Sequence, residues 1–171
     1  NCLRMTRPKD ENELQKREAT GVIRASRFVR KYAHSHRAIN IQAISLIHRE
    51  IFREAWPEIA GKYRTENVEI TGSKHLPPHF SKVSEMMLLF DNELKNSVKE
   101  CELVEGYILD FNGDTKEKFD AIEKILNLAA RIHHIITFIH PYVEGNGRTA
   151  RLAGNLILER FGLVGLSVKI V

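Results

Sequence analysis

Twelve residues near the end of the sequence combine side chains that can handle a phosphorylated ligand. The stretch 140–151 reads HPYVEGNGRTAR, so a histidine, a carboxylate, glycines and two arginines lie close together. Gly145 and Gly147 flank Asn146 and allow backbone angles that turn successive N–H groups toward an anion. The helix expected to begin at Arg148 adds the positive end of its dipole. The stretch therefore predicts a phosphate-binding loop.

The charged residues of this loop are unfavourably placed unless a polyanion is bound. Arg148 and Arg151 share the first turn of a helix, where each cation opposes the helix dipole at a cost of about 0.3–1 kcal/mol. Glu144 would repel phosphates unless a divalent cation lay between them, and Mg²⁺ is bound through one or two carboxylates plus phosphate oxygens. Pro141 ends the preceding helix at His140, where the helix carbonyls favour a protonated imidazole. Together these residues predict a metal–nucleotide phosphate site.

The remaining sequence predicts helices that position this loop. Apolar residues recur at helical spacing in five segments, numbered approximately 13–32, 40–56, 81–100, 115–139 and 148–161. Asn40 is expected to cap the second segment, which should end near Trp56-Pro57 because proline disfavours helical geometry in the residue before it. The segment 115–139 is expected to be the central, buried helix. Its predicted apolar stripe consists of Phe119, Ile122, Leu126, Ala129, Ile132 and Ile136.

Residues 61–78 have a different pattern, with good strand formers from Tyr63 to Thr71. Glu66 and Asn67 are expected to form a turn, and Gly72 helps to close the segment. A short hairpin or an extended loop is therefore expected there.

Composition sets limits on the class of protein. The chain has 171 residues, enough for one domain with a core, and a formal charge of +4 that is spread among acidic residues. Direct nucleic-acid binding is therefore not expected, and no apolar run of transmembrane length is present. Cys2 and Cys101 cannot form a disulfide framework, so a reducing, cytoplasmic compartment and no membrane association are expected.

The stretch 140–151 resembles the Fic signature, HPFx(D/E)GNGRxxR, and matches it at every defined position except Tyr142, which replaces Phe. Residues 61–65, followed by Val68 and Gly72, are similar to the family's flap region. This resemblance implies a single all-α Fic-type helical domain over residues 1–171, with a short β-hairpin flap at about 61–78 and the core motif at 140–151.

The resemblance implies a protein adenylyltransferase that moves AMP from ATP to a Ser, Thr or Tyr hydroxyl of a target protein. It makes His140 the general base, and it makes Glu144 the ligand of a Mg²⁺ between the α- and β-phosphates. The residues 145–147 would form the anion hole, Arg148 would grip the β-phosphate and Arg151 the γ-phosphate. The flap would pair with the target backbone as an added strand through Val68, Glu69, Ile70, Thr71 and Gly72.

Two other functions stay open. Transfer of UMP or of a phosphoryl group is known on the same fold, and the kinase-like Doc branch resembles this motif but has Lys where this chain has Gly147. Gly147 together with Arg151 therefore favours AMP transfer. A catalytically silent nucleotide-binding module is the third alternative, and the intact His140 weakens it.

The sequence lacks the inhibitory motif that is common in Fic enzymes. Fic enzymes are commonly inhibited by a helix with the pattern (S/T)xxxE(G/N), whose Glu pairs with the second arginine of the motif, here Arg151. None of the glutamates followed by Gly or Asn has Ser or Thr four residues earlier; they are Glu11, Glu66, Glu105 and Glu144. The inhibitory helix could come from a separate antitoxin, which would make this chain the toxin of a pair; it could lie beyond Val171, or be absent.

Overall fold

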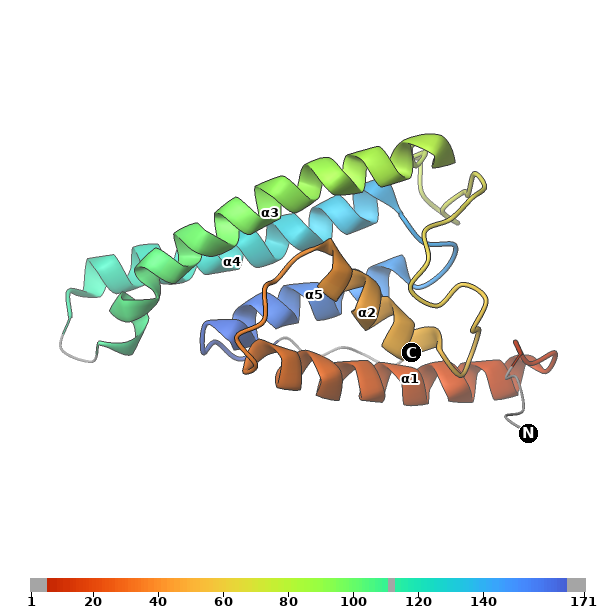
Figure 1. Ribbon diagram of the computed structural model, residues 1–171, viewed down its shortest axis with the longest axis horizontal. Coiled ribbons are helices and arrows are strands. Elements are labelled where there is room, and N and C mark those ends of the chain that lie inside the picture. The colour runs from red at the N-terminus through yellow and green to blue at the C-terminus, as the bar shows by residue number, and fades with distance from the viewer. Residues whose placement is uncertain (1–5, 111–112, 166–171) are drawn as a thin grey trace.

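A computed structural model describes residues 6–110 and 113–165. Within these residues the chain forms five α-helices: α1 (Glu11–Ala33), α2 (Ile41–Phe52), α3 (Phe80–Leu109), α4 (Thr115–Ile139) and α5 (Asn146–Arg160). Figure 1 shows α3 and α4 as a long antiparallel pair above α2 and α5, with α1 along the opposite side. The all-α fold is therefore confirmed. In the described part of the chain, no helix is both long and apolar enough to cross a membrane.

Four of the five described helices begin where a side chain accepts from one of their first free N–H groups. The Asn40 side chain accepts a hydrogen bond from Ala43 N, as predicted, at 3.0 Å. Asp114 likewise accepts from Lys116 N at 2.9 Å and starts α4. The helix ends were less well predicted, because α2 already ends at Phe52, ahead of Trp56-Pro57.

The most buried helix is α5, and the prediction that α4 is the central one was wrong. α5 packs against α1, α2 and α4, and it is buried almost continuously from Thr149 to Leu158. On α4, Phe119 and Leu126 are 69% and 49% exposed, because α3 and α5 cover only part of its apolar surface. The buried positions of α4 are instead Ala121, Ile125, Leu128, Ala129, Ile132, Ile136 and Ile139.

The connection between α2 and α3 consists of turns and irregular backbone, and no strand occurs among its described residues. The β-hairpin predicted for residues 61–78 was therefore wrong. Backbone carbonyls of this segment are bound by the buried side chain of Arg64 instead of by a second strand. Its Nη1 donates to Glu66 O at 2.9 Å and its Nη2 donates to Pro78 O. A turn at Gly72, whose φ is 75°, reverses the chain with a bond from Ser73 N to Ile70 O.

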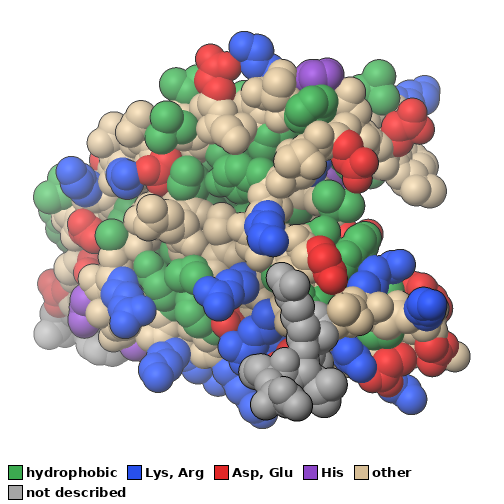
Figure 2. Space-filling view, turned by 45° about the vertical axis from the view of Figure 1, so that its right-hand side comes forward, with side chains coloured by type: hydrophobic (Ala, Val, Ile, Leu, Met, Phe, Trp, Pro, Cys, Tyr) green, Lys and Arg blue, Asp and Glu red, His purple; other side chains and the backbone are tan. Residues whose placement is uncertain are grey.

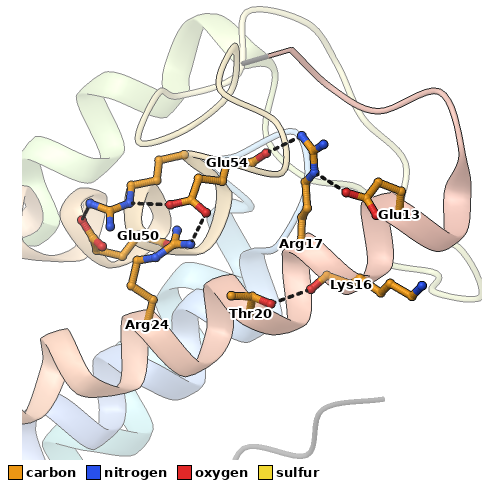
Figure 3. Close-up of polar contacts among 8 residues, drawn as sticks. Glu13, Lys16, Arg17, Thr20, Arg24, Glu50 and Glu54 are labelled. Carbon is orange, nitrogen blue, oxygen red and sulfur yellow. Dashed lines mark hydrogen bonds and ion pairs between the residues drawn. The ribbon is translucent and has the colours of Figure 1, made fainter. Parts of the chain in front are cut away.

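Arginines of α1 bind the C-terminal end of α2, as Figure 3 shows. Arg24 donates from Nη1 to Glu50 O at 3.1 Å and from Nη2 to the Glu54 carboxylate at 2.6 Å. Arg17 donates to Glu54 O at 3.3 Å. Because the last carbonyls of a helix have no partner within it, these bonds fix the rotation of α1 on α2.

Gly21 allows the backbone of α1 to lie directly against the backbone of α2. A Cβ built on Gly21 would lie only 1.9 Å from Ile51 O, a backbone atom that cannot move without shifting α2. We expect Gly21→Ala to lower the free energy of unfolding by roughly 3 kcal/mol, at the upper end of overpacking effects. Chemical denaturation would check this. Ala19→Gly on the same helix is the control, because it costs only about 1 kcal/mol of helix propensity. A Gly21→Ala protein as stable as the wild type would contradict the close approach.

Candidate active site

The loop between α4 and α5 begins with a strained residue. His140 has φ 53° and ψ 58°, in the left-handed region that residues other than glycine seldom adopt. Arg64 stabilises this conformation, since its Nε donates to His140 O at 2.8 Å and its backbone N–H donates to Pro141 O at 2.9 Å. Its Nη2 also reaches Ile139 O at 3.4 Å. The flap and the loop are therefore clamped together by one guanidinium.

The Asn146 side chain closes the loop. Its Oδ1 accepts from Tyr142 N at 2.9 Å and its Nδ2 donates to Tyr142 O at 2.8 Å, and the residue is buried. The side chain therefore points into the protein. Any contact of Asn146 with a phosphate would have to come from its backbone N–H.

The N-terminus of α5 lacks the side-chain cap that the other described helices have. Its first residue follows Gly145, and no side chain accepts from its first N–H groups in the described structure. Gly145 itself is required by the fold, because its φ is 77° and a Cβ would lie 2.3 Å from the Phe52 ring. Gly147 is different. Its φ is not positive, and the atom nearest to a Cβ built at this position, Arg151 Nη1, is 3.9 Å away. Packing does not require glycine at 147, so its missing side chain leaves room for a ligand.

The two glycines therefore give a matched pair of variants. We expect Gly147→Ala to change the free energy of unfolding by no more than about 1 kcal/mol, because alanine is the better helix former. The same variant should weaken ATP binding about tenfold or more, because its methyl group faces the proposed phosphate. Gly145→Ala should instead destabilise the protein, by roughly 2–3 kcal/mol from strain and overpacking. Denaturation and ATP titration measure both. Normal ATP affinity in Gly147→Ala would mean that the open side of Gly147 does not contact the phosphates.

Arg148 is held by two carboxylates, one of which the sequence did not suggest. Its Nη1 lies 2.6 Å from Glu18 Oε2 on α1, and its Nη2 lies 3.3 Å from Glu144 Oε1. Its guanidinium also lies over the Phe52 ring, 5.2 Å from the centroid. Arg151 is exposed, and within the described ranges no carboxylate lies within ion-pair distance of it. The predicted site residues on this side of the loop are thus brought together.

These side chains border a cavity of about 480 Å³ between α1 and the start of α5. Its lining includes Glu144, Arg148 and Arg151 from the loop and α5, Glu18 from α1, and Trp56. Figure 2 shows Lys and Arg side chains gathered on the lower part of the face that it displays, at the height of α1. Three guanidiniums line this cavity, those of Arg7, Arg148 and Arg151, and Arg148 is in the first turn of α5. Such a set of donors is suited to a polyphosphate.

The His140 imidazole is half-buried, and its Nδ1 lies 3.3 Å from Thr137 O. A carbonyl can only accept, so Nδ1 carries the hydrogen and Nε2 is left as the basic nitrogen. Burial lowers the pKa of His140 below 6.5, and the Thr137 carbonyl opposes this only in part. This direction is opposite to the one expected at the helix end, because burial has the largest effect on the pKa and disfavours the protonated imidazole. A neutral histidine is the form that a general base needs.

Tyr142, the one departure from the signature, is fully buried under the loop. Its ring stacks on His48 with centroids 3.8 Å apart, and its hydroxyl lies 3.3 Å from Ser45 Oγ. His48 was not predicted as a site residue. Its Nδ1 accepts from Gly61 N at 2.9 Å, so its Nε2 donates to Glu144 O at 3.0 Å. The neutral ring therefore links the flap to the loop.

His48 should make the protein sensitive to acid. Burial lowers the pKa of His48 from 6.5 to about 4. The unfolded chain therefore binds this proton more readily, so the stabilisation is complete above about pH 6.5 and is lost as the pH falls toward 4. We expect a loss on the order of 3 kcal/mol across that range, since one pKa unit corresponds to about 1.4 kcal/mol. Denaturation at a series of pH values measures it. Glutamine does not titrate, so in His48→Gln this part of the dependence of the free energy of unfolding on pH should be absent. An unchanged dependence would mean that His48 is not the group responsible.

One carboxylate of the loop is suited to a divalent cation. Glu144 is exposed, and its Oε1 now accepts from Gly145 N at 2.8 Å and from Arg148. Among the described residues, no group of three or more His, Cys, Asp or Glu side chains could hold a metal by itself. Glu144 therefore fits Mg²⁺ only as a partner of nucleotide phosphates and water, which is how Mg²⁺ is usually held.

Comparison with known proteins places this site in a family. The sequence profile described as "Fic/DOC family" matches residues 38–158. A protein adenylyltransferase Fic from Nematostella vectensis is 31% identical over 157 residues, which cover 91% of this chain and 31% of that protein. Protein adenylyltransferase fic-1 from Caenorhabditis elegans is 32% identical over 148 residues, which cover 85% of this chain and 24% of that protein. The chain thus spans about a third or less of the length of these relatives.

Solved structures show the same fold. Residues 134–508 of Fic-1 from C. elegans match with a TM-score of 0.54 and 27% identity, over 82% of this chain and 35% of that one. BepC from Bartonella tribocorum, solved with AMPPNP, matches with a TM-score of 0.55 over 88% of this chain and 69% of that one. Its identity of 17% supports the fold alone. Since the family profile covers residues 38–158, including the whole loop and most of α5, this chain belongs to the Fic/DOC family.

Proposed function

We propose that this domain is a protein adenylyltransferase, which transfers AMP from ATP to a Ser, Thr or Tyr hydroxyl of a target protein. The observation that carries the proposal is the start of α5, where uncapped N–H groups and the open side of Gly147 lie beside Arg148 and Arg151. The half-buried His140, with its lowered pKa, supports a base at the same loop. The names of the relatives agree with this activity.

In the proposed reaction, the target hydroxyl oxygen attacks the α-phosphorus of ATP in line with the leaving group. The hydroxyl proton passes to Nε2 of His140, and the bond between the α-phosphorus and the bridging oxygen breaks, which releases pyrophosphate. The N–H groups at 145–147 stabilise charge on the α-phosphate, Arg148 binds the β-phosphate and Arg151 the γ-phosphate. Glu144 would hold Mg²⁺, which neutralises charge on the α- and β-phosphates.

We further propose that the target docks on the flap by adding a strand along Val68–Gly72. This is supported by the unpaired backbone there, because within the described residues the N–H groups of Val68, Glu69 and Ile70 have no partner. Unpaired backbone is what such docking needs. Hydrogen exchange measured with and without target should show protection confined to this segment. No protection would refute the docking mode.

Labelled ATP separates the candidate reactions. The protein is incubated with candidate targets and ATP labelled on either the α- or the γ-phosphate. Transfer of the α-label supports AMP transfer, whereas transfer of the γ-label supports a kinase. Labelled UTP in a parallel reaction tests UMP transfer. Binding of ATP without any transfer would support a silent module.

We also propose that a separate inhibitory protein, such as an antitoxin, restrains the enzyme in the cytoplasm. Support comes from Arg151, which has no carboxylate partner in the described parts of the chain, whereas Arg148 has two. The buried free thiol of Cys101, whose pKa burial raises to about 11, suits a reducing compartment. A candidate inhibitor should lose its effect on Arg151→Ala; full inhibition of that variant would contradict this contact.

A further inference from the structure

The arginine that begins α5 has a partner that comes from the far end of the sequence. Glu18 Oε2 on α1 lies 2.6 Å from Arg148 Nη1, across 130 residues of chain. The two side chains are only 15% and 23% exposed. A short, charge-assisted bond between largely buried groups holds its geometry better than an exposed surface pair does.

The second carboxylate on Arg148, that of Glu144, is both more distant and more exposed than that of Glu18. Glu144 Oε1 lies 3.3 Å from Nη2, and its side chain is 52% exposed. Glu144 is also the residue placed to bind a cation. A cation would draw this carboxylate away and free Nη2 for a phosphate, while the Glu18 contact on Nη1 could remain.

Glu18 is rigidly placed. Its neighbours along α1 fix the helix on α2, since Arg17 and Arg24 bind Glu54 O and Glu50 O at 3.3 and 3.1 Å (Figure 3). Gly21, one turn away, allows α1 to lie against Ile51. A flexible arginine loses side-chain entropy when it binds a phosphate, and a fixed partner removes that loss in advance.

We propose that Glu18 is a positioning residue, which holds Arg148 in the orientation that binds nucleotide phosphate, whereas the Glu144–Arg148 contact belongs to the nucleotide-free state and opens on binding. This inference rests on the proposed function, because it takes Arg148 as a phosphate ligand. It makes α1, which lies outside the residues matched by the family profile, part of the nucleotide site.

A double-mutant cycle tests the proposal. MgATP binding is measured by calorimetry for the wild type, Glu18→Gln, Arg148→Gln and the double variant. Glu18→Gln keeps the length of the side chain and removes its charge. It should weaken MgATP binding about tenfold in the wild-type background and less than twofold in the Arg148→Gln background. Glu13→Gln is the matched control, because Glu13 is on the same helix and pairs with the partly exposed Arg17. It should bind MgATP as the wild type does.

The outcomes separate the inference from the proposed function. Equal weakening in both backgrounds would mean that Glu18 acts through the fold, and it would overturn the proposal. Unchanged or tighter binding by Glu18→Gln would overturn it as well, and tighter binding would show that Glu18 repels phosphate. A wild type that binds no MgATP would overturn both the nucleotide site and the inference. A wild type that binds MgATP but transfers no AMP would overturn only the proposed reaction, if the cycle shows coupling.

Discussion

Replacing His140 by alanine is expected to lower AMP transfer by about 10²–10⁴-fold, which is the usual contribution of a positioned general base. ATP affinity should stay within about twofold of the wild type, because the phosphate contacts proposed above come from the loop backbone and the two arginines. The structure leaves Nε2 of His140 basic, since Nδ1 faces Thr137 O at 3.3 Å. Transfer of label from α-labelled ATP measures the rate, and calorimetry measures the affinity.

His134→Ala is the matched control for this variant. His134 is an exposed histidine of the same helix, and its ring contacts Phe138 rather than the loop. It should transfer AMP at nearly the wild-type rate. Because burial lowers the pKa of His140, the acid limb of kcat/KM should lie below pH 6.5, where protonation removes the base. A His140→Ala protein that still modifies its target would refute the assignment.

The helices could be predicted because their signals are local. Caps such as Asn40 and Asp114 and the apolar spacing of the segments need only neighbouring residues to be recognised. The burial of each helix could not be predicted, because it depends on which helices pack together. α4 carries apolar residues on more than one face, so periodicity favoured it as the central helix. α5 is more deeply buried because it contacts three other helices.

In the flap, a local signal was present but the predicted hairpin did not form. Residues from Tyr63 to Thr71 have strand propensity, but propensity does not supply a partner strand. The structure uses Arg64 to satisfy Glu66 O and Pro78 O, and in the described structure the N–H groups of Val68, Glu69 and Ile70 between them have no partner. An arginine whose donors are shared among carbonyls of two separate segments cannot be recognised from its position in the sequence.

In the candidate site, the contiguous loop residues could be predicted, but the residues that support them from other helices could not. The loop residues are contiguous, so their types and spacing predicted the phosphate site directly. Glu18 and His48 act across the fold, and neither has a local signal: Glu18 is one of several charges on an amphipathic helix, and His48 lies between the apolar Ile47 and the charged Arg49. Each of them supports a loop residue: Glu18 binds Arg148 from the wall of the same cavity, and His48 binds the Glu144 carbonyl from beneath the loop. Supporting contacts of this kind become visible only when the helices are packed.

Arg64→Ala is expected to have the largest effect on stability. Its guanidinium donates to four carbonyls, two in the flap and two at the end of α4, and it is only 3% exposed. Bonds to a charged donor contribute about 1.5–3 kcal/mol each, and removing the donor leaves buried carbonyls without a partner. Because such contributions are not additive, we expect a total loss of about 3–5 kcal/mol in the free energy of unfolding. Chemical denaturation measures it.

Two further variants show what this arginine does for catalysis. Arg131→Ala removes an exposed arginine paired with Glu93 and should cost no more than about 1 kcal/mol. Arg64→Lys keeps the charge but lacks the planar fork, so it cannot reach the flap and His140 O at once. At a temperature where Arg64→Lys is fully folded, AMP transfer should still fall about tenfold or more, because the left-handed backbone of His140 loses its support. A folded Arg64→Lys protein with normal transfer would mean that Arg64 stabilises the domain without positioning the base.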